Sequence, residues 1–175
     1  ATIIQGFPSI GLVSTIATKF LIDHLNVEQI GHFESQHLMP LTAIHKSKVV
    51  EPISIYHNKK YNIIIIQSLA DVKGIEWDLA NCILKMAKDL QAKEVITIEG
   101  TPSRSKTISV FYHSNKKKKL KIDPIQEGII MGVTAAIILK GKIPMLSLFA
   151  ETHSQMPDSE SAANVIKVLD DYLKL

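Results

Sequence analysis

The sequence contains one cysteine and one arginine, and it has no long uncharged apolar run. A single cysteine, Cys82, excludes a disulfide within the chain and fits a reducing cytoplasm. Because Cys82 lies on the apolar side of a predicted helix, we expect a core thiol rather than a nucleophile. The single arginine, Arg104, limits sites that hold phosphate or carboxylate groups through bidentate contacts.

The apolar runs that are present are too short for a membrane span, which needs about 20 residues. The longest, residues 128–139, is better explained as a buried helix, and no N-terminal signal pattern is visible. We therefore expect a cytoplasmic protein without a membrane partner. The length of 175 residues, with 46% hydrophobic and 21% charged residues, is typical of one soluble globular domain covering residues 1–175. A net charge of +3 is too small to indicate nucleic-acid binding by itself.

Several catalytic and cofactor motifs are also absent. The chain has neither the Gly-Lys-Ser/Thr ending of a phosphate-binding loop nor the G-x-G-x-x-G dinucleotide fingerprint. It lacks a Gly-x-Ser-x-Gly elbow for a serine nucleophile and a paired-histidine spacing for a metal. The sequence thus predicts no catalytic residue, no metal and no cofactor, and it favours a non-enzymatic protein.

The clearest positive feature is an opening unit of strand, tight loop and helix. Residues 2–5 form a short β-branched run, and residues 13–25 carry apolar side chains at helical spacing. Phe7, Pro8 and Gly11 lie in the loop between them. The free backbone N–H groups at the start of such a helix can hold an anion. We favour a packing role for the loop, because a close strand-to-helix turn by itself needs small residues.

The rest of the chain alternates predicted strands and helices, which indicates an α/β fold with a mostly parallel sheet. Residues 63–66 are apolar on both faces, which predicts a central strand covered on both sides. Residues 42–57 form a β-excursion with a turn at 46–48. Helices are expected at 76–90, at 127–139 and after Pro157. Strands are expected at 29–35, 42–45, 53–57, 61–67, 95–98, 109–113, 120–122 and 144–150.

Polar side chains follow several predicted strands at their carboxyl ends, where open α/β sheets bind ligands. Such clustered carboxylates could act as acid and base, or bind a hard metal. We favour a third explanation, in which they cap loops and helices where the strands emerge into solvent. Arg104 occupies an irregular loop after the strand at 95–98. The other candidates at these positions are Glu34, Gln67, Glu99, Glu127, Glu151 and His153.

Four consecutive lysines at residues 116–119 form the turn of a predicted hairpin. Lysines in a turn are usually solvated, and they discourage edge-to-edge pairing of sheets. No aromatic residues interleave with them, which argues against nucleic acid as a partner.

Four sequence blocks resemble proteasome-assembly-chaperone proteins in the form found in archaea. They are Gly-Phe-Pro-Ser-Ile-Gly-Leu-Val at 6–13, Pro-Ile-Ser-Ile-Tyr at 52–56, Glu-Gly-Ile-Ile-Met-Gly at 127–132, and Leu-Phe-Ala-Glu-Thr at 148–152 with Pro-Asp at 157–158 and Ala-Ala at 162–163. The blocks occur in the family's order and cover nearly the whole chain. Two departures are Glu99-Gly100, where a glycine pair is expected, and Ala135-Ala136, where a further glycine is expected.

The resemblance implies an α/β sandwich, similar in topology to nucleoside phosphorylases and related hydrolases, that serves as a binding module. It also implies proteasome α subunits as partners and a homo-oligomeric state. An assembly chaperone of this kind should expose an apolar patch. The alternative is a small-molecule binder or enzyme of the nucleoside-phosphorylase type. It would use the Phe7–Gly11 loop for an anion, strand-end carboxylates for a ribose or base, and Arg104 in the cleft.

Overall fold

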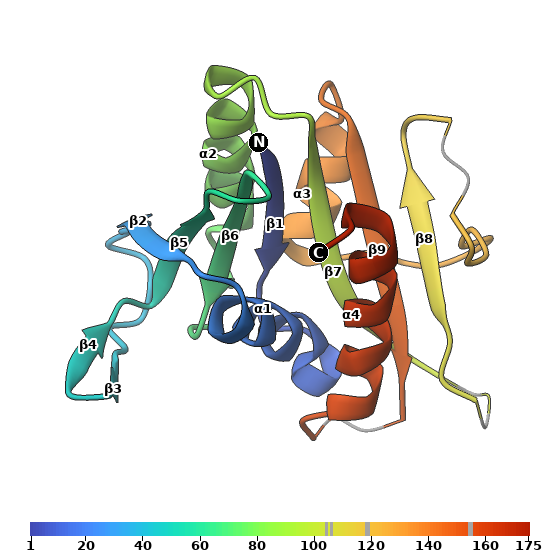
Figure 1. Cartoon of the computed structure of the whole chain (residues 1–175), viewed down its shortest axis with the longest axis horizontal. Coiled ribbons are helices and arrows are strands. Elements are labelled where there is room, and N and C mark those ends of the chain that lie inside the picture. Colours follow the sequence, from blue (N-terminus) through green and yellow to red (C-terminus); the bar gives the residue numbers. More distant parts are fainter. Residues whose placement is uncertain (104, 106, 118–119, 154–155) are drawn as a thin grey trace.

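A seven-stranded sheet forms the centre of the computed structural model, which describes residues 1–103, 105, 107–117, 120–153 and 156–175 (Figure 1). The strand order is β2-β5-β6-β1-β7-β9-β8. The four inner strands β6, β1, β7 and β9 are parallel, and β5, β2 and β8 add antiparallel pairs at the two edges. The predicted α/β class with a mostly parallel central sheet is therefore confirmed. The bounds are β1 Thr2–Gly6, β2 Glu28–His32, β5 Ile53–Asn58, β6 Ile63–Ser68, β7 Glu94–Pro102, β8 Val110–Ser114 and β9 Met145–Thr152.

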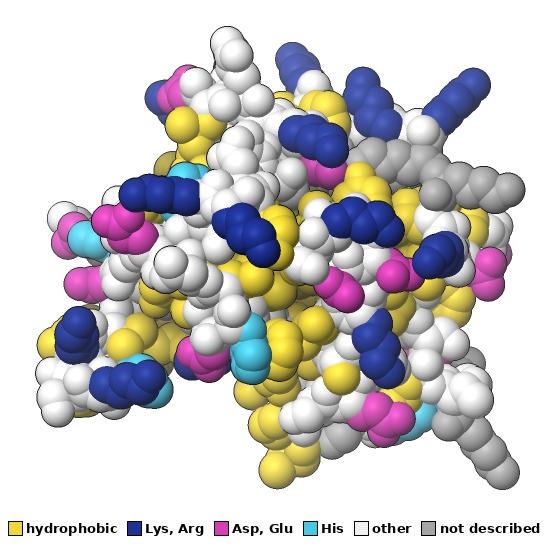
Figure 2. All heavy atoms as spheres, in the orientation of Figure 1, with side chains coloured by type: hydrophobic (Ala, Val, Ile, Leu, Met, Phe, Trp, Pro, Cys, Tyr) yellow, Lys and Arg dark blue, Asp and Glu magenta, His cyan; other side chains and the backbone are white. Residues whose placement is uncertain are grey.

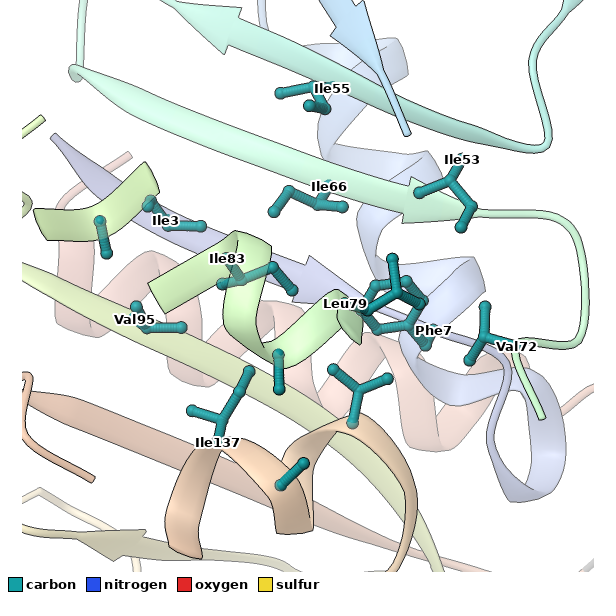
Figure 3. Packing of buried hydrophobic residues seen from close by; sticks show 14 of the residues in the cluster. Ile3, Phe7, Ile53, Ile55, Ile66, Val72, Leu79, Ile83, Val95 and Ile137 are labelled. Atoms are coloured by element: carbon teal, nitrogen blue, oxygen red, sulfur yellow. The ribbon is translucent and has the colours of Figure 1, made fainter. Parts of the chain in front are cut away.

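Helices cover both faces of the sheet. One face packs against α2 (Glu76–Asp89) and α3 (Gly132–Lys140), and the other packs against α1 (Val13–His24) and α4 (Ser159–Leu173). Alternate strand residues serve the two cores, so that Ile3 faces α2 and α3 while Ile4 faces the opposite pair. Figure 3 shows Ile3, Ile66 and Val95 meeting Ile83 and Ile137 from the helices. Residues 63–66 are all buried, which confirms the predicted central strand.

A small hairpin projects from the β5 side of the sheet (Figure 1). It consists of β3 (Ala43–His45) and β4 (Lys48–Val50), which pair only with each other. Lys46 and Ser47 both have positive φ, at 49° and 60°, which is the backbone of a tight two-residue hairpin turn. The predicted turn and first short strand are thus confirmed, and β4 is a strand that the sequence pattern did not predict.

The structure corrects three local predictions. Residues 120–122 are not a strand, because only an isolated bridge between Tyr112 and Pro124 adds to β8 there. The helix predicted at 127–139 begins at Gly132, whose φ of 73° lies in the left-handed region and separates the helix from the extended residue Met131. Its burial is one-sided rather than complete, since Leu139 is 74% exposed. Cys82 is also exposed, because the neighbouring Ile83 occupies the core-facing position of α2.

Candidate functional site

The loop between β1 and α1 lies against the carboxyl ends of β7 and β9. The Gly100 backbone N–H donates to Ser9 Oγ at 3.1 Å, and the Asp158 N–H donates to the Gly11 carbonyl at 2.9 Å. At Gly100 there is no room for a side chain, since a Cβ atom would lie 1.9 Å from the Ile10 carbonyl oxygen. The short helix η1 (Ile10–Leu12) is therefore packed directly on the β7 backbone.

The surroundings of Gly11 argue against an anion in this loop. Gly11 has a φ of 67°, and a Cβ atom there would lie 2.8 Å from Thr152 Oγ1 and 3.3 Å from the Asp158 Cβ. Burial raises the pKa of Asp158, but hydrogen bonds from the Ser161 backbone, Thr152 and the Ser161 hydroxyl outweigh it and hold the pKa below its ordinary value. A carboxylate kept ionised beside the loop repels a second negative charge.

Phe7, Pro8 and Gly11 therefore lie among side chains that hold the loop in place. The Phe7 side chain is 3% exposed and belongs to the core beneath α2 (Figure 3). Ser14 Oγ donates to the Phe7 carbonyl, and this hydrogen bond ties the loop to the first turn of α1. Pro8 is half-buried between these anchored positions.

A row of buried polar side chains crosses three parallel strands on the α2/α3 face. Gln5 of β1 is in register with Thr97 of β7, which is in register with Ser147 of β9, and all three are fully buried. Thr97 Oγ1 donates to Ser147 Oγ at 2.8 Å, and Gln5 Nε2 donates to Thr134 Oγ1 at 2.9 Å. Within the described residues, Gln5 Oε1 is buried without a hydrogen-bond partner. The sequence analysis missed this row, although each member is a single polar residue inside an apolar strand.

Glu99 extends this row toward the carboxyl end of β7. Thr134 Oγ1, in the first turn of α3, donates to Glu99 Oε1 at 2.6 Å. Burial raises the pKa of Glu99 from 4.5 to about 7, and the hydrogen bond from Thr134 opposes this only in part. A carboxyl with a pKa near neutrality can hold or release a proton at physiological pH. Among the predicted candidates that the structure describes, Glu99 is thus the one whose environment gives it unusual chemistry, and it stands at a departure from the resembled pattern.

The other predicted candidates do not converge on Glu99. Gln67 lies on the opposite face of the sheet, where its Nε2 donates to the Thr15 carbonyl at 3.3 Å. Glu151 accepts a hydrogen bond from the Ser109 backbone at 3.1 Å, which fits the expectation that such carboxylates cap loops. The remaining three are exposed: Glu34 beyond the end of β2, Glu127 ahead of α3, and His153 after β9. Arg104 lies outside the described residues.

Metal and membrane sites receive no support from the described part of the chain. No group of three or more His, Cys, Asp or Glu residues there is placed to hold a metal ion. Among the same residues, no helix has the length and apolar character needed to cross a bilayer.

Comparisons with known proteins agree with the resemblance carried by the four sequence blocks. The model of the PAC2 family matches residues 3–175. The chain belongs to the PAC2 family. The crystal structure of Pyrococcus furiosus PbaA, an archaeal homolog of proteasome-assembly chaperone, is 26% identical with a TM-score of 0.90, and the match covers 99% of this chain and 81% of PbaA. The resemblance to archaeal proteasome-assembly-chaperone proteins is confirmed.

Two further relatives of this PAC2 chain extend the comparison. The uncharacterized protein MJ0106 of Methanocaldococcus jannaschii is 29% identical over 184 residues, covering 99% of this chain and 75% of that protein. Pyrococcus furiosus PbaB, an archaeal proteasome activator, shares the fold with a TM-score of 0.79 at 22% identity, covering 99% of this chain and 84% of PbaB. The likeness to nucleoside phosphorylases is not tested by these comparisons and stays a prediction.

Proposed function

We propose that this PAC2 chain is a non-enzymatic protein-binding module that assists proteasome assembly by binding α subunits. The observation that carries the proposal is the similarity to PbaA, which extends over 99% of the chain at a TM-score of 0.90. A chaperone of this kind works through surface contacts, so its activity needs exposed apolar side chains rather than a catalytic group.

Exposed apolar side chains occur near the carboxyl ends of the parallel strands. Ile129 and Met131, ahead of α3, are 93% and 76% exposed, and Ile10 and Leu12 of η1 are 38% and 37% exposed. Figure 2 shows hydrophobic side chains gathered at the lower edge of the molecule, below α1. Large exposed apolar residues are costly in water, and a protein partner that covers them gains binding energy.

Native mass spectrometry of the protein with α subunits from its own source tests the proposal. We expect a defined homo-oligomer that forms a complex with α subunits. Replacement of Ile129 and Met131 by serine should weaken that complex by about tenfold or more, because both side chains lose apolar contact area. Leu90→Ser is the matched control, since Leu90 is also exposed, at 49%, but follows the carboxyl end of α2. Failure of the unmodified protein to bind α subunits contradicts the proposal.

The environment of Glu99 supports a second candidate, a small-molecule site beside Glu99 in the carboxyl-terminal half of β7. Its raised pKa and the unpartnered Gln5 Oε1 are features of binding and catalytic sites in α/β folds. The same mass spectra distinguish the two functions. A small molecule that travels with the protein and is lost in Glu99→Gln, without any complex with α subunits, would favour this second candidate.

A further inference from the structure

A groove lies between the segment that follows β8 and the outer surface of α4. Its volume is about 290 Å³, and its walls include Leu120 and Ile122 on one side and Val168 and Tyr172 on the other. All four side chains are partly buried and pack on the core beneath α1 and α4. Most of the lining is thus apolar but open to solvent, and its volume suits one or two bulky side chains.

The groove is fixed in shape by contacts at both walls. On the β8 side, the Ile125 N–H donates to the Tyr112 carbonyl at 2.8 Å, and the Tyr112 N–H donates to the Asp123 carbonyl at 3.1 Å. On the α4 side, Leu169 is fully buried, and the Tyr172 hydroxyl donates to the Glu94 carboxylate at 2.8 Å. A preformed groove loses little conformational entropy when a ligand enters it.

Two lysines flank the apolar walls, since Lys121 and Lys167 both line the groove. In Figure 2, lysine side chains are numerous over the upper half of this face. The acidic group in the lining is Asp171, which pairs with Lys121 at 2.8 Å. Both partners are mostly exposed, and such surface pairs contribute at most about 1 kcal/mol. Lys121 can therefore exchange Asp171 for a carboxylate on a ligand.

We propose that this groove docks an acidic segment of a partner protein. A bulky apolar side chain of the segment fills the cavity between Ile122 and Val168, and flanking carboxylates pair with Lys121 and Lys167. The combination of apolar walls with a cationic rim selects a peptide over a nucleic acid, since a phosphate backbone gains nothing from the walls. Base stacking also needs aromatic platforms, and Tyr172 is the one aromatic side chain in the described lining. The proposal goes beyond the proposed function, because the groove would bind an acidic segment of this kind whether or not it belongs to an α subunit.

Fluorescence anisotropy with a labelled peptide of about eight residues, alternating glutamate with leucine or phenylalanine, tests the proposal. We expect saturable binding that weakens in Lys167→Glu by about tenfold, because a cation at the rim becomes a repelling anion. Val168→Ser should also weaken binding, because it removes apolar contact area from the α4 wall of the groove. Lys85→Glu is the matched control, since Lys85 is an exposed lysine on α2, on the other face of the sheet, and should leave binding unchanged.

Two comparisons separate the possible ligands. A peptide with lysines in place of the glutamates should not bind, and raising salt from about 50 to 500 mM should weaken but not abolish binding of the acidic peptide. The proposal is overturned if Lys167→Glu binds the acidic peptide as well as the unmodified protein does. It is also overturned if single-stranded RNA or anionic vesicles bind the groove more tightly than the peptide. Circular dichroism confirms that Lys167→Glu, an exposed substitution, stays folded. Binding of α subunits is measured separately, so failure of the groove leaves the proposed function standing.

Discussion

Glu99→Gln provides the sharpest test of the electrostatics around the buried carboxyl of β7. The substitution removes the charge but keeps an oxygen that can accept the hydrogen bond from Thr134, now 2.6 Å from Glu99 Oε1. The pKa of Glu99 is raised from 4.5 to about 7 by burial. A shift of this size corresponds to about 3 kcal/mol of lost folding stability once the carboxyl is ionised. Since the residue is partly exposed, water screens some of this cost, and we expect about 1–3 kcal/mol.

The sign of the pH dependence follows from proton binding in the two states. Between pH 4.5 and about 7 the unfolded chain has lost this proton while the folded protein keeps it. The contribution of Glu99 to the free energy of unfolding is therefore complete below pH 4.5, and it is lost as the pH rises to about 7. Above that pH both states are ionised, and the contribution changes no further. Glu99→Gln abolishes this dependence.

Urea unfolding at about pH 4.5 and about pH 8.5 measures the effect. We expect Glu99→Gln to match the unmodified protein at the lower pH and to exceed its stability by about 1–3 kcal/mol at the higher pH. Glu127→Gln is the control, because Glu127 is an exposed carboxyl ahead of α3 and its neutralisation should have little effect at either pH. A stability difference that is the same at both pH values would refute the reasoning, since it would mean that Glu99 is not the group that titrates.

Two other predictions follow from the packing around η1 and the start of α4. Gly100→Ala should destabilise the protein by about 3 kcal/mol or more, because its Cβ would lie 1.9 Å from the Ile10 carbonyl oxygen. Gly31→Ala is the control, because a Cβ atom at Gly31 would lie 3.9 Å from its nearest neighbour, Ile55 Cδ1. A similar loss of thermal stability in both variants would contradict the clash as the cause. Asp158→Ala should cost about 1–2 kcal/mol at neutral pH, since Asp158 caps α4 by accepting from the Ser161 N–H at 3.0 Å. Because the pKa of Asp158 is lowered, this contribution is present above its ordinary pKa of 3.8 and is lost as the pH falls through the folded value. Asp158→Asn should keep most of the cap in urea unfolding, and equal losses in both variants would count against the capping role.

Much of the fold could be predicted because strand and helix periodicities are local properties of the chain. An unbroken apolar run predicts that residues 63–66 are covered on both faces of the sheet, and they are buried. The spacing of apolar residues likewise predicts the order of strands and helices. The helix start at Gly132 was predicted five residues too early. Residues 128–131 belong to an apolar run that periodicity cannot separate from a helix, and the break depends on a backbone angle at one glycine.

The candidate site was less predictable, because its chemistry depends on which strands become neighbours. The sequence by itself predicted a buried strand at 95–98 with Glu99 directly after it, and the family resemblance expects a glycine at that position. In the structure the strand continues to Pro102, so Glu99 lies inside β7. Only the tertiary structure placed Gln5, Thr97 and Ser147 side by side and brought Thr134 of α3 to the Glu99 carboxyl. The raised pKa of Glu99 arises from this burial, which no local pattern contains. Likewise, the groove between residues 120–122 and α4 is formed by segments about fifty residues apart in the sequence. They meet because β8 and α4 both pack on β9. Local sequence fixes the elements, while long-range packing decides which side chains share an environment.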